Sequence, residues 1–162
     1  MNKLFLITGP AGVGKSTISK ELSKRFPKTI LIEGDDIYHL VKNGYVSAWK
    51  KGNHLELFWK NSIDLIRNGL ELGYDVIFNY IIDKDDLDNL KKTFGEYDIT
   101  FKVLLTSSEE LLKRDKQRPL DCQMKDRCIV LLNDFKYKNY DKKDIIDTTN
   151  LSVDEVVDEI LK

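Results

Sequence analysis

The sequence predicts an α/β fold in which a five-stranded parallel sheet is covered by helices. Two observations lead to this prediction: five short apolar runs alternate with helical patterns, and a glycine-rich segment directly follows the first run. Alternating strands and helices imply right-handed crossovers and therefore parallel strands. A length of 162 residues suits one domain, 1–162.

Each expected strand is a short, nearly continuous apolar run, as buried parallel strands require. The first run ends at a glycine, the second ends before Gly34 and the third follows Gly73. The expected strands are 3–8, 29–33, 74–79, 99–106 and 144–147.

Helix starts are marked by a polar side chain placed three residues before a carboxylate. This capping-box spacing satisfies backbone N–H groups that have no partner inside the helix. It occurs at Asn53 with Glu56, Ser107 with Glu110, Ser152 with Glu155 and, in a similar form, Asp83 with Asp86.

The composition excludes several classes of protein. Hydrophobic residues make up 41% and charged residues 33%, and no run is long enough to span a membrane. The apolar stretch 1–7 leads straight into glycines, so we expect no signal peptide. A net charge of −1 predicts no nucleic-acid partner. With only Cys122 and Cys128, both expected as free thiols, we predict a cytoplasmic protein. We expect it to be a monomer or homodimer.

The segment 9–16 reads Gly-Pro-Ala-Gly-Val-Gly-Lys-Ser and matches Gly-x-x-x-x-Gly-Lys-[Ser/Thr] in full. Its backbone N–H groups are expected to wrap a phosphate, with glycines where a side chain would collide. Lys15 then reaches the β- and γ-phosphates and Ser16 holds Mg²⁺. The residues predicted to bind the nucleotide here are Gly9, Pro10, Ala11, Gly12, Val13, Gly14, Lys15, Ser16 and Thr17.

Beyond this motif, the sequence resembles P-loop small-molecule kinases, especially the group of chloramphenicol phosphotransferase and gluconate kinase. The resemblance covers nearly the whole chain, with loose motifs outside 9–16. It implies a three-layer P-loop NTPase fold that is nucleotide-kinase-like, with a small helical lid at about 113–127. It also implies ATP and Mg²⁺ as cofactors.

An acidic pair follows the second expected strand. In kinases of the resembled type, an aspartate here takes the proton of the acceptor hydroxyl, a role that falls on Asp35, with Asp36 as the alternative. Asp35 is also predicted to help Ser16 hold Mg²⁺. A helix N-cap is the structural alternative for these residues.

Arginines gather in the segment that the resemblance assigns to the lid. Arg114 and Arg118 share one helix face if that helix continues to Pro119, and Arg127 begins the next helix. The resemblance implies that these arginines stabilise the transferring phosphate. A solvated basic surface is the alternative.

Two further positions concern the nucleotide site. Thr148 and Thr149 follow the last expected strand, where the resembled kinases border adenine. Asn79 ends the third strand, where many P-loop enzymes have a magnesium-holding aspartate. An uncharged residue there leaves a weak or degenerate catalyst possible.

The sequence therefore predicts an ATP-dependent kinase that phosphorylates a hydroxyl of a small molecule. Lys15, Asp35, Arg114, Arg118 and Arg127 are its expected catalytic residues. The alternatives are a nucleotide or nucleoside kinase and an ATP-binding regulator with little transfer. A cluster of aromatic residues either walls the acceptor pocket or packs the core: Tyr38, Tyr45, Trp49, Phe58 and Trp59.

Overall fold

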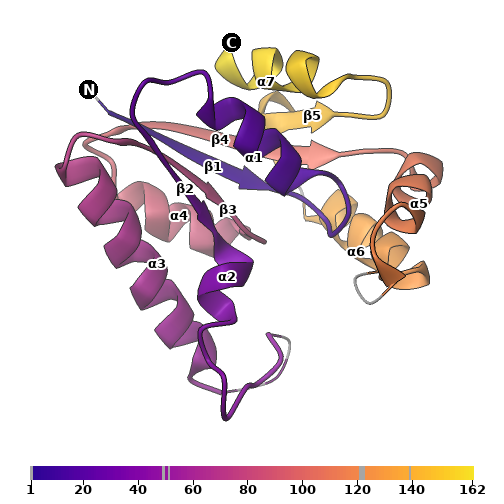
Figure 1. The fold of residues 1–162 in the computed structure, drawn as a ribbon, viewed down its shortest axis with the longest axis horizontal. Helices are drawn as coiled ribbons and strands as arrows, with labels where there is room; N and C mark the ends of the chain where they lie inside the picture. The colour runs from indigo at the N-terminus through magenta and orange to yellow at the C-terminus, as the bar shows by residue number, and fades with distance from the viewer. Residues whose placement is uncertain (1, 49, 51, 121–122, 139) are drawn as a thin grey trace.

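The computed structural model describes residues 2–48, 50, 52–120, 123–138 and 140–162. Five parallel strands form one sheet in the order β2-β3-β1-β4-β5 (Figure 1). The predicted α/β fold with a five-stranded parallel sheet is confirmed, and each strand lies within a residue or so of its expected place. The strands are β1 Lys3–Thr8, β2 Thr29–Glu33, β3 Asp75–Asn79, β4 Asp98–Leu105 and β5 Ile145–Asp147.

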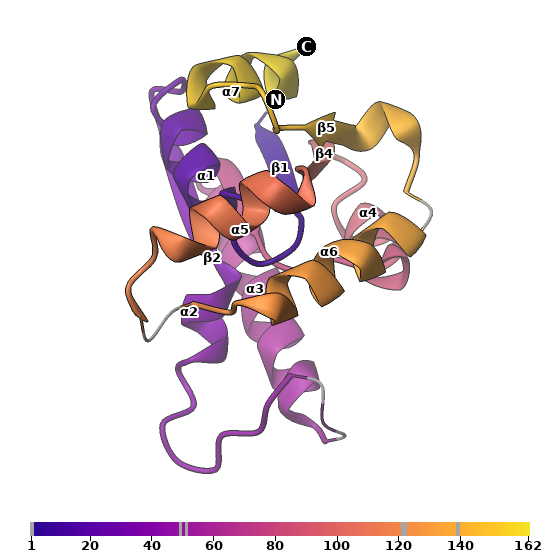
Figure 2. The ribbon, with the colours of Figure 1, turned by 90° about the vertical axis from the view of Figure 1, so that its right-hand side faces the viewer.

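Seven α-helices and one 3₁₀ turn connect and cover the strands in the described part of the chain. α5 and α6 pack on one another at one end of the sheet (Figure 2). The helices are α1 Lys15–Ser23, α2 Gly34–Tyr38, α3 His54–Glu71, α4 Lys84–Thr93, α5 Ser108–Lys116, α6 Asp126–Tyr137 and α7 Val153–Leu161, with the 3₁₀ turn η2 at Lys142–Asp144. None of the described helices is long and apolar enough to cross a membrane.

The alternation of side chains along β1 divides the core into two layers. Leu4 and Leu6 pack with α3 and α4 on one face, whereas Phe5 and Ile7 pack with α1 and α7 on the other. All four side chains are almost completely buried. The period of two along a strand thus gives the three layers of the fold.

Three of the four expected caps form. Asp83 and Ser152 make complete capping boxes, and the Ser107 side chain accepts from the backbone N–H of Glu110. Asn53 precedes α3 but makes no side-chain cap bond, so that prediction is wrong. Its backbone is not extended (φ −88°, ψ 3°), whereas a capping residue normally is. Glu56 instead pairs with Lys60.

The strand register brings three polar residues to one edge of the sheet. Asn79 is the register partner of Ile7 in β1 and of Glu33 in β2, and Thr8 ends β1 beside them. Gly34 follows Glu33, and a Cβ atom there would lie 2.5 Å from the Tyr80 ring. Glycine at this position therefore lets the Tyr80 ring pack against the start of α2.

Candidate active site

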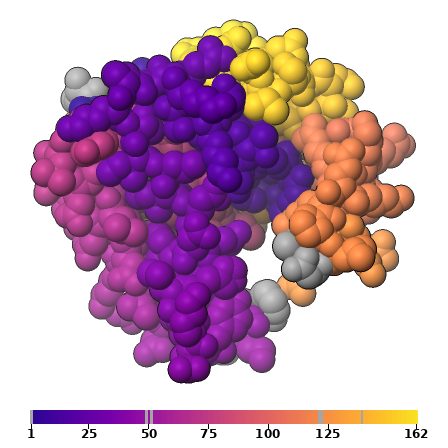
Figure 3. All heavy atoms as spheres, in the orientation of Figure 1, coloured from indigo at the N-terminus to yellow at the C-terminus, as the bar shows by residue number. Residues whose placement is uncertain are grey.

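A cleft of about 580 Å³ opens at the carboxyl edge of the sheet. It is lined by Ala11, Gly12 and residues 14–17, by one side of α2 and the loop after it, by Asn79 and the two residues after β3, and by α5, α6 and described residues between them. Val13 is instead buried in the core. Figure 3 shows the hollow between the α2–α3 part of the surface and the α5–α6 part. Ligands of open parallel sheets bind in this position, and the volume suits a small-molecule ligand.

The loop between β1 and α1 has a backbone that only glycine adopts easily. Gly12 and Gly14 have φ angles of 84° and 109°, and Gly9 has a φ of 151°. A Cβ atom on Gly9 would lie 2.4 Å from the carbonyl oxygen of Leu104. Gly14 is also the N-cap of α1, and without a side chain it leaves the first N–H groups of that helix free for an anion.

Lys15 folds back over this loop. Its Nζ donates to the carbonyl oxygens of Gly9 and Pro10 at 2.8 and 3.1 Å. Burial lowers the pKa of Lys15 to about 8, while the carboxylates of Asp35 and Glu33 act in the opposite direction and Arg118 adds to the lowering. The charges of Asp35 on α2, Glu33 at the end of β2 and Arg118 after α5 therefore all act on Lys15.

A residue outside the expected set, Glu33, lies beside the predicted magnesium ligand. The Ser16 hydroxyl donates to Glu33 Oε2 at 2.6 Å. Glu33 Oε1 and the Nδ2 of the neighbouring Asn79 are buried, and neither has a hydrogen-bond partner among the described residues. The signal that could have found Glu33 is its place at the end of a parallel strand next to the first.

The donor set fits Mg²⁺. A hydroxyl and a carboxylate oxygen are hard ligands, and Mg²⁺ is usually held by one or two such groups together with phosphates and water. Among the described residues no cluster of three or more His, Cys, Asp or Glu side chains forms a cage of its own. Ser16 and Glu33 are therefore the residues that could hold the ion once a nucleotide supplies the remaining oxygens.

The structure separates the two candidate bases on α2. Asp35 lines the cleft, and its charge acts on both Lys15 and Tyr80. Both side chains are exposed, but Asp36 does not belong to the cleft lining. Neither is the N-cap of α2, which is Glu33. Burial, with the nearby Asp35 carboxylate, raises the pKa of Tyr80, so this hydroxyl stays protonated beside Asp35.

Arg114 is tied to the protein by hydrogen bonds. Its guanidinium donates to Val13 O at 2.9 Å, to Thr148 Oγ1 at 3.1 Å and to Thr148 O at 3.0 Å, and its Nε donates to Glu110 at 3.0 Å. Since a guanidinium has five N–H donors, one remains for a ligand in the cleft that Arg114 lines. Arg114 thus joins the phosphate loop to the segment after β5.

The two threonines that were expected at the base serve this same junction. Thr148 is buried and accepts two of the four Arg114 bonds, while its backbone N–H donates to Leu105 O. The Thr149 hydroxyl accepts from the Ser107 N–H at 2.8 Å. Neither threonine lines the cleft. A contact of their backbone with the nucleotide base stays a prediction.

Asp115 organises the segment that is expected to form the lid. Its buried carboxylate accepts from Met124 N at 3.0 Å and from Lys125 N at 2.7 Å, and it pairs with Arg118 at 3.4 Å. Burial alone would raise the pKa of Asp115, but these donors outweigh it and the pKa is lowered. Lys125 is held with a positive φ of 50°.

The helix that carries the lid arginines is shorter than expected. α5 ends at Lys116 because the N–H groups of Gln117 and Arg118 bond three residues back, to Arg114 and Asp115. Arg118 therefore lies beyond the helix and lines the cleft, as does Arg127 at the start of α6. Cys128 is a free, buried thiol, and Cys122 lies outside the described residues.

A strand, a glycine-rich loop and a helix that together cradle a phosphate site define a P-loop nucleotide-binding protein of kinase-like fold. The chain belongs to the AAA_18 family, an AAA domain, whose family model matches residues 6–130. Its fold is that of the P-loop small-molecule kinases, a class that uses ATP and Mg²⁺, and the resemblance stated above is confirmed.

Similar proteins include guanylate kinases and other kinases. The guanylate kinase of Prochlorococcus marinus subsp. pastoris is 28% identical over 182 residues, covering 100% of this chain and 96% of that protein. Among solved structures, the tunicamycin resistance protein of Deinococcus radiodurans has a TM-score of 0.71 at 18% identity, covering 99% and 94% of the two chains. A gluconokinase from Sinorhizobium meliloti has a TM-score of 0.71 at 14% identity, covering 98% and 89%.

Binding of ATP with Mg²⁺ should weaken above pH 8. The free protein holds Lys15 with a pKa of about 8, so at higher pH the lysine must take up a proton to bind phosphate as a cation. We expect the Kd to rise about tenfold per pH unit between pH 8 and 9.5, as measured by calorimetry. Lys15→Arg, which stays charged, should bind with little pH dependence. An equally flat profile in the parent protein would contradict the proposed coupling.

Removing the Asp115 carboxylate should loosen the lid. Asp115→Ala leaves the N–H groups of Met124 and Lys125 without their acceptor, so amide exchange in 117–128 should become about 10–100-fold faster. Hydrogen exchange with mass-spectrometric detection measures this, and ATP with Mg²⁺ should slow exchange in the parent protein. Asp134→Ala, on an exposed part of α6, is the matched control. Equal exchange in the two variants would show that Asp115 does not hold the lid.

Proposed function

We propose that this protein transfers the γ-phosphate of ATP to a hydroxyl group of a small molecule. The observation that carries the proposal is the placement of Asp35 in the same cleft as Lys15, close enough for its charge to act on the lysine. A carboxylate facing the phosphate-binding lysine suits a base that orients an acceptor hydroxyl.

The five charged residues that line the cleft each have a part in the proposed transfer. ATP supplies the phosphoryl group, whose phosphorus bonds to the acceptor oxygen as its bond to the bridging oxygen breaks. Asp35 accepts the hydroxyl proton, and Lys15 neutralises charge on the β- and γ-phosphates. Arg118 and Arg127, which line the lid side, contact the transferring group. Arg114 acts mainly by holding the shape of the loop through Val13.

The charges around the cleft favour an uncharged acceptor. Its cationic side chains are Lys15, Arg114, Arg118 and Arg127, all on the nucleotide and lid sides. The opposite wall carries Asp35 and the aromatic and apolar side chains of α2 and of the residue pair after β3. A phosphate on the acceptor would lie against the Asp35 carboxylate, whereas a hydroxyl would find a base.

A nucleotide kinase is the second candidate, and the guanylate kinase relatives favour it. Such an acceptor carries a phosphate that a cation must hold. Arg67, the one arginine between 26 and 113, pairs with Asp64 on α3, packs over the Phe94 ring and does not line the cleft. This arrangement supports the alcohol acceptor over the nucleotide.

The third candidate, an ATP-binding regulator without transfer, rests on Asn79, which carries no charge. Glu33 weakens that argument, since it presents a carboxylate to Ser16 from the neighbouring strand. One carboxylate is therefore available for magnesium. It lies at the end of β2, whereas many P-loop enzymes carry it at the end of β3. The metal role first given to Asp35 stays a prediction, and Glu33 is the better-placed residue.

Asp35→Asn should abolish transfer while preserving ATP binding. The amide keeps the shape of the side chain but cannot accept the proton, so kcat should fall about 10²–10⁴-fold. ADP release stimulated by a library of hydroxyl compounds measures the loss, and calorimetry measures ATP affinity. Asp36→Asn is the matched control on the same helix and should retain activity. Full activity in Asp35→Asn would remove Asp35 from the mechanism.

Glu33→Gln should weaken the use of Mg²⁺. The amide removes the charge that faces Ser16, so the Mg²⁺ concentration for half-maximal ADP release should rise about tenfold or more. Metal-free nucleotide binding should change little or become tighter, because a negative charge beside the phosphates is lost. Glu71→Gln, at the exposed end of α3, is the control. Unchanged Mg²⁺ dependence would exclude Glu33 from the metal site.

A further inference from the structure

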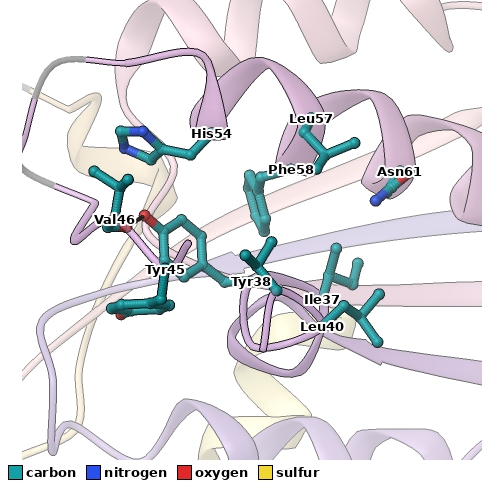
Figure 4. Close-up of a pocket in the computed structure, with 10 residues that line it drawn as sticks. Ile37, Tyr38, Leu40, Tyr45, Val46, His54, Leu57, Phe58 and Asn61 are labelled. Carbon is teal, nitrogen blue, oxygen red and sulfur yellow. Dashed lines mark hydrogen bonds between the residues drawn. The ribbon is translucent and has the colours of Figure 1, made fainter. Parts of the chain in front are cut away.

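A second cavity, of about 160 Å³, lies on the other side of α2 from the phosphate cleft. Figure 4 shows its side chains arranged around a common space, contributed by α2, the loop after it and the first turns of α3. An apolar cavity of about 150 Å³ is large enough to hold a benzene ring. Most of its walls are aliphatic or aromatic: Ile37, Leu40, Val41, Val46, Leu57 and Phe58.

Tyr38 and Tyr45 line both cavities, so the two spaces share a wall. Their rings meet edge to face with centroids 5.6 Å apart. Tyr38 is buried and its hydroxyl donates to the carbonyl oxygen of Val46, which fixes its ring, whereas Tyr45 is 49% exposed. In this shared wall the Tyr38 ring is therefore fixed, whereas the Tyr45 ring has room to change its side-chain rotamer.

The cavity begins one helical turn from the proposed base. Asp35 and Tyr38 are three residues apart on α2, which corresponds to a rise of about 4.5 Å. A ring held in the cavity could therefore carry a hydroxyl to Asp35 on a short aliphatic chain. A compact sugar would fit in the cleft without entering this cavity. If it did enter, its hydroxyls would lose hydrogen bonds to water against the apolar walls.

His54 gives the cavity a polar end. Its ring stands edge-on to Tyr38, with centroids 6.1 Å apart, and lies beside Val46 in Figure 4. Both imidazole nitrogens are buried, and neither has a hydrogen-bond partner among the described residues. A buried polar group without a partner costs free energy, so a ligand that bonds to it gains affinity. Asn61 on α3 adds a further polar side chain to the lining. Apolar walls with a few polar groups are typical of a small-molecule pocket.

We propose that this cavity binds an aromatic ring of the phosphate acceptor. A hydrogen-bonding substituent on the ring faces His54, and the acceptor hydroxyl reaches Asp35 on a short aliphatic tether. This inference rests on the proposed transfer to a hydroxyl and narrows the acceptor to an aromatic alcohol. The transfer itself is the step already described: the hydroxyl oxygen bonds to the γ-phosphorus, the bridging bond breaks and Asp35 takes the proton.

The test is a series of alcohols that vary the distance between ring and hydroxyl. Phenylalkanols with one to four methylene groups, their 4-hydroxyphenyl counterparts, and glycerol and gluconate as ring-free acceptors are compared by ADP release with ATP and Mg²⁺. We expect one tether length to exceed the others at least tenfold in kcat/KM. The 4-hydroxyl should add about 5–10-fold, and His54→Phe should abolish that addition.

A pocket-filling variant separates the cavity from the rest of the helix. Leu57→Trp extends a larger side chain from the cavity wall, and Leu65→Trp makes the same change two turns further along α3, outside the lining. The two leucines are similarly exposed, at 49% and 45%. Leu57→Trp should raise the KM for the preferred alcohol at least tenfold without changing ATP affinity, and Leu65→Trp should behave as the parent protein.

The outcomes distinguish the aromatic-acceptor inference from the proposed phosphate transfer on which it rests. Turnover of glycerol or gluconate, with no preference for ring compounds and no effect of Leu57→Trp, would overturn the aromatic acceptor and leave the kinase proposal standing. Saturation-transfer NMR with 4-ethylphenol reports ring binding independently of turnover. Binding that Leu57→Trp abolishes, without turnover of any alcohol, would overturn both the acceptor role of the cavity and the proposed transfer.

Discussion

The parallel register of β1, β2 and β3 is the constraint on which the site depends. Because parallel strands end at the same edge, the backbone leaves the sheet at Thr8, Glu33 and Asn79 side by side. Three segments begin from this edge: the phosphate loop, helix α2 and the residues around Tyr80. A register shift of one residue would turn the Glu33 side chain to the other face of the sheet and remove it from Ser16.

The lid side depends on two consecutive residues of α5. Neighbouring residues of an α-helix point about 100° apart, so Arg114 and Asp115 face different parts of the protein. Arg114 turns toward Val13 and Thr148, and Asp115 turns toward Met124 and Lys125. One short helix therefore connects the phosphate loop to the lid. Arg118, an arginine of the expected lid, pairs with the same Asp115 carboxylate.

The sequence was sufficient for what depends on local pattern. The strands follow from apolar runs, the phosphate loop from its glycine spacing, and the start of α4 from the Asp83–Asp86 box. Contacts between distant segments were missed. Glu33 reads as the last residue of a strand, and Asp115 reads as one charge in a charged stretch, because nothing local shows that each carboxylate is enclosed. The aromatic cluster could not be assigned from the sequence to a pocket wall or to the core. Tyr38 and Tyr45 line cavities, whereas Trp59 packs against the core. Trp49 lies outside the described residues.

The distribution of charge links these observations to the proposed chemistry. Glu33 and Asn79 are register partners, so a carboxylate on β2 and an amide on β3 place one negative charge beside Ser16. A second carboxylate there would repel the phosphates and Asp35 more strongly in the enclosed cleft. Asp35 lies in the same cleft as Lys15, where the proposed mechanism has its carboxylate accept a proton from an alcohol. One carboxylate is therefore available for the metal and another for the acceptor, an arrangement that agrees with the proposed transfer to an uncharged hydroxyl. The role of Asn79 is to complete the edge of the sheet without adding a further negative charge.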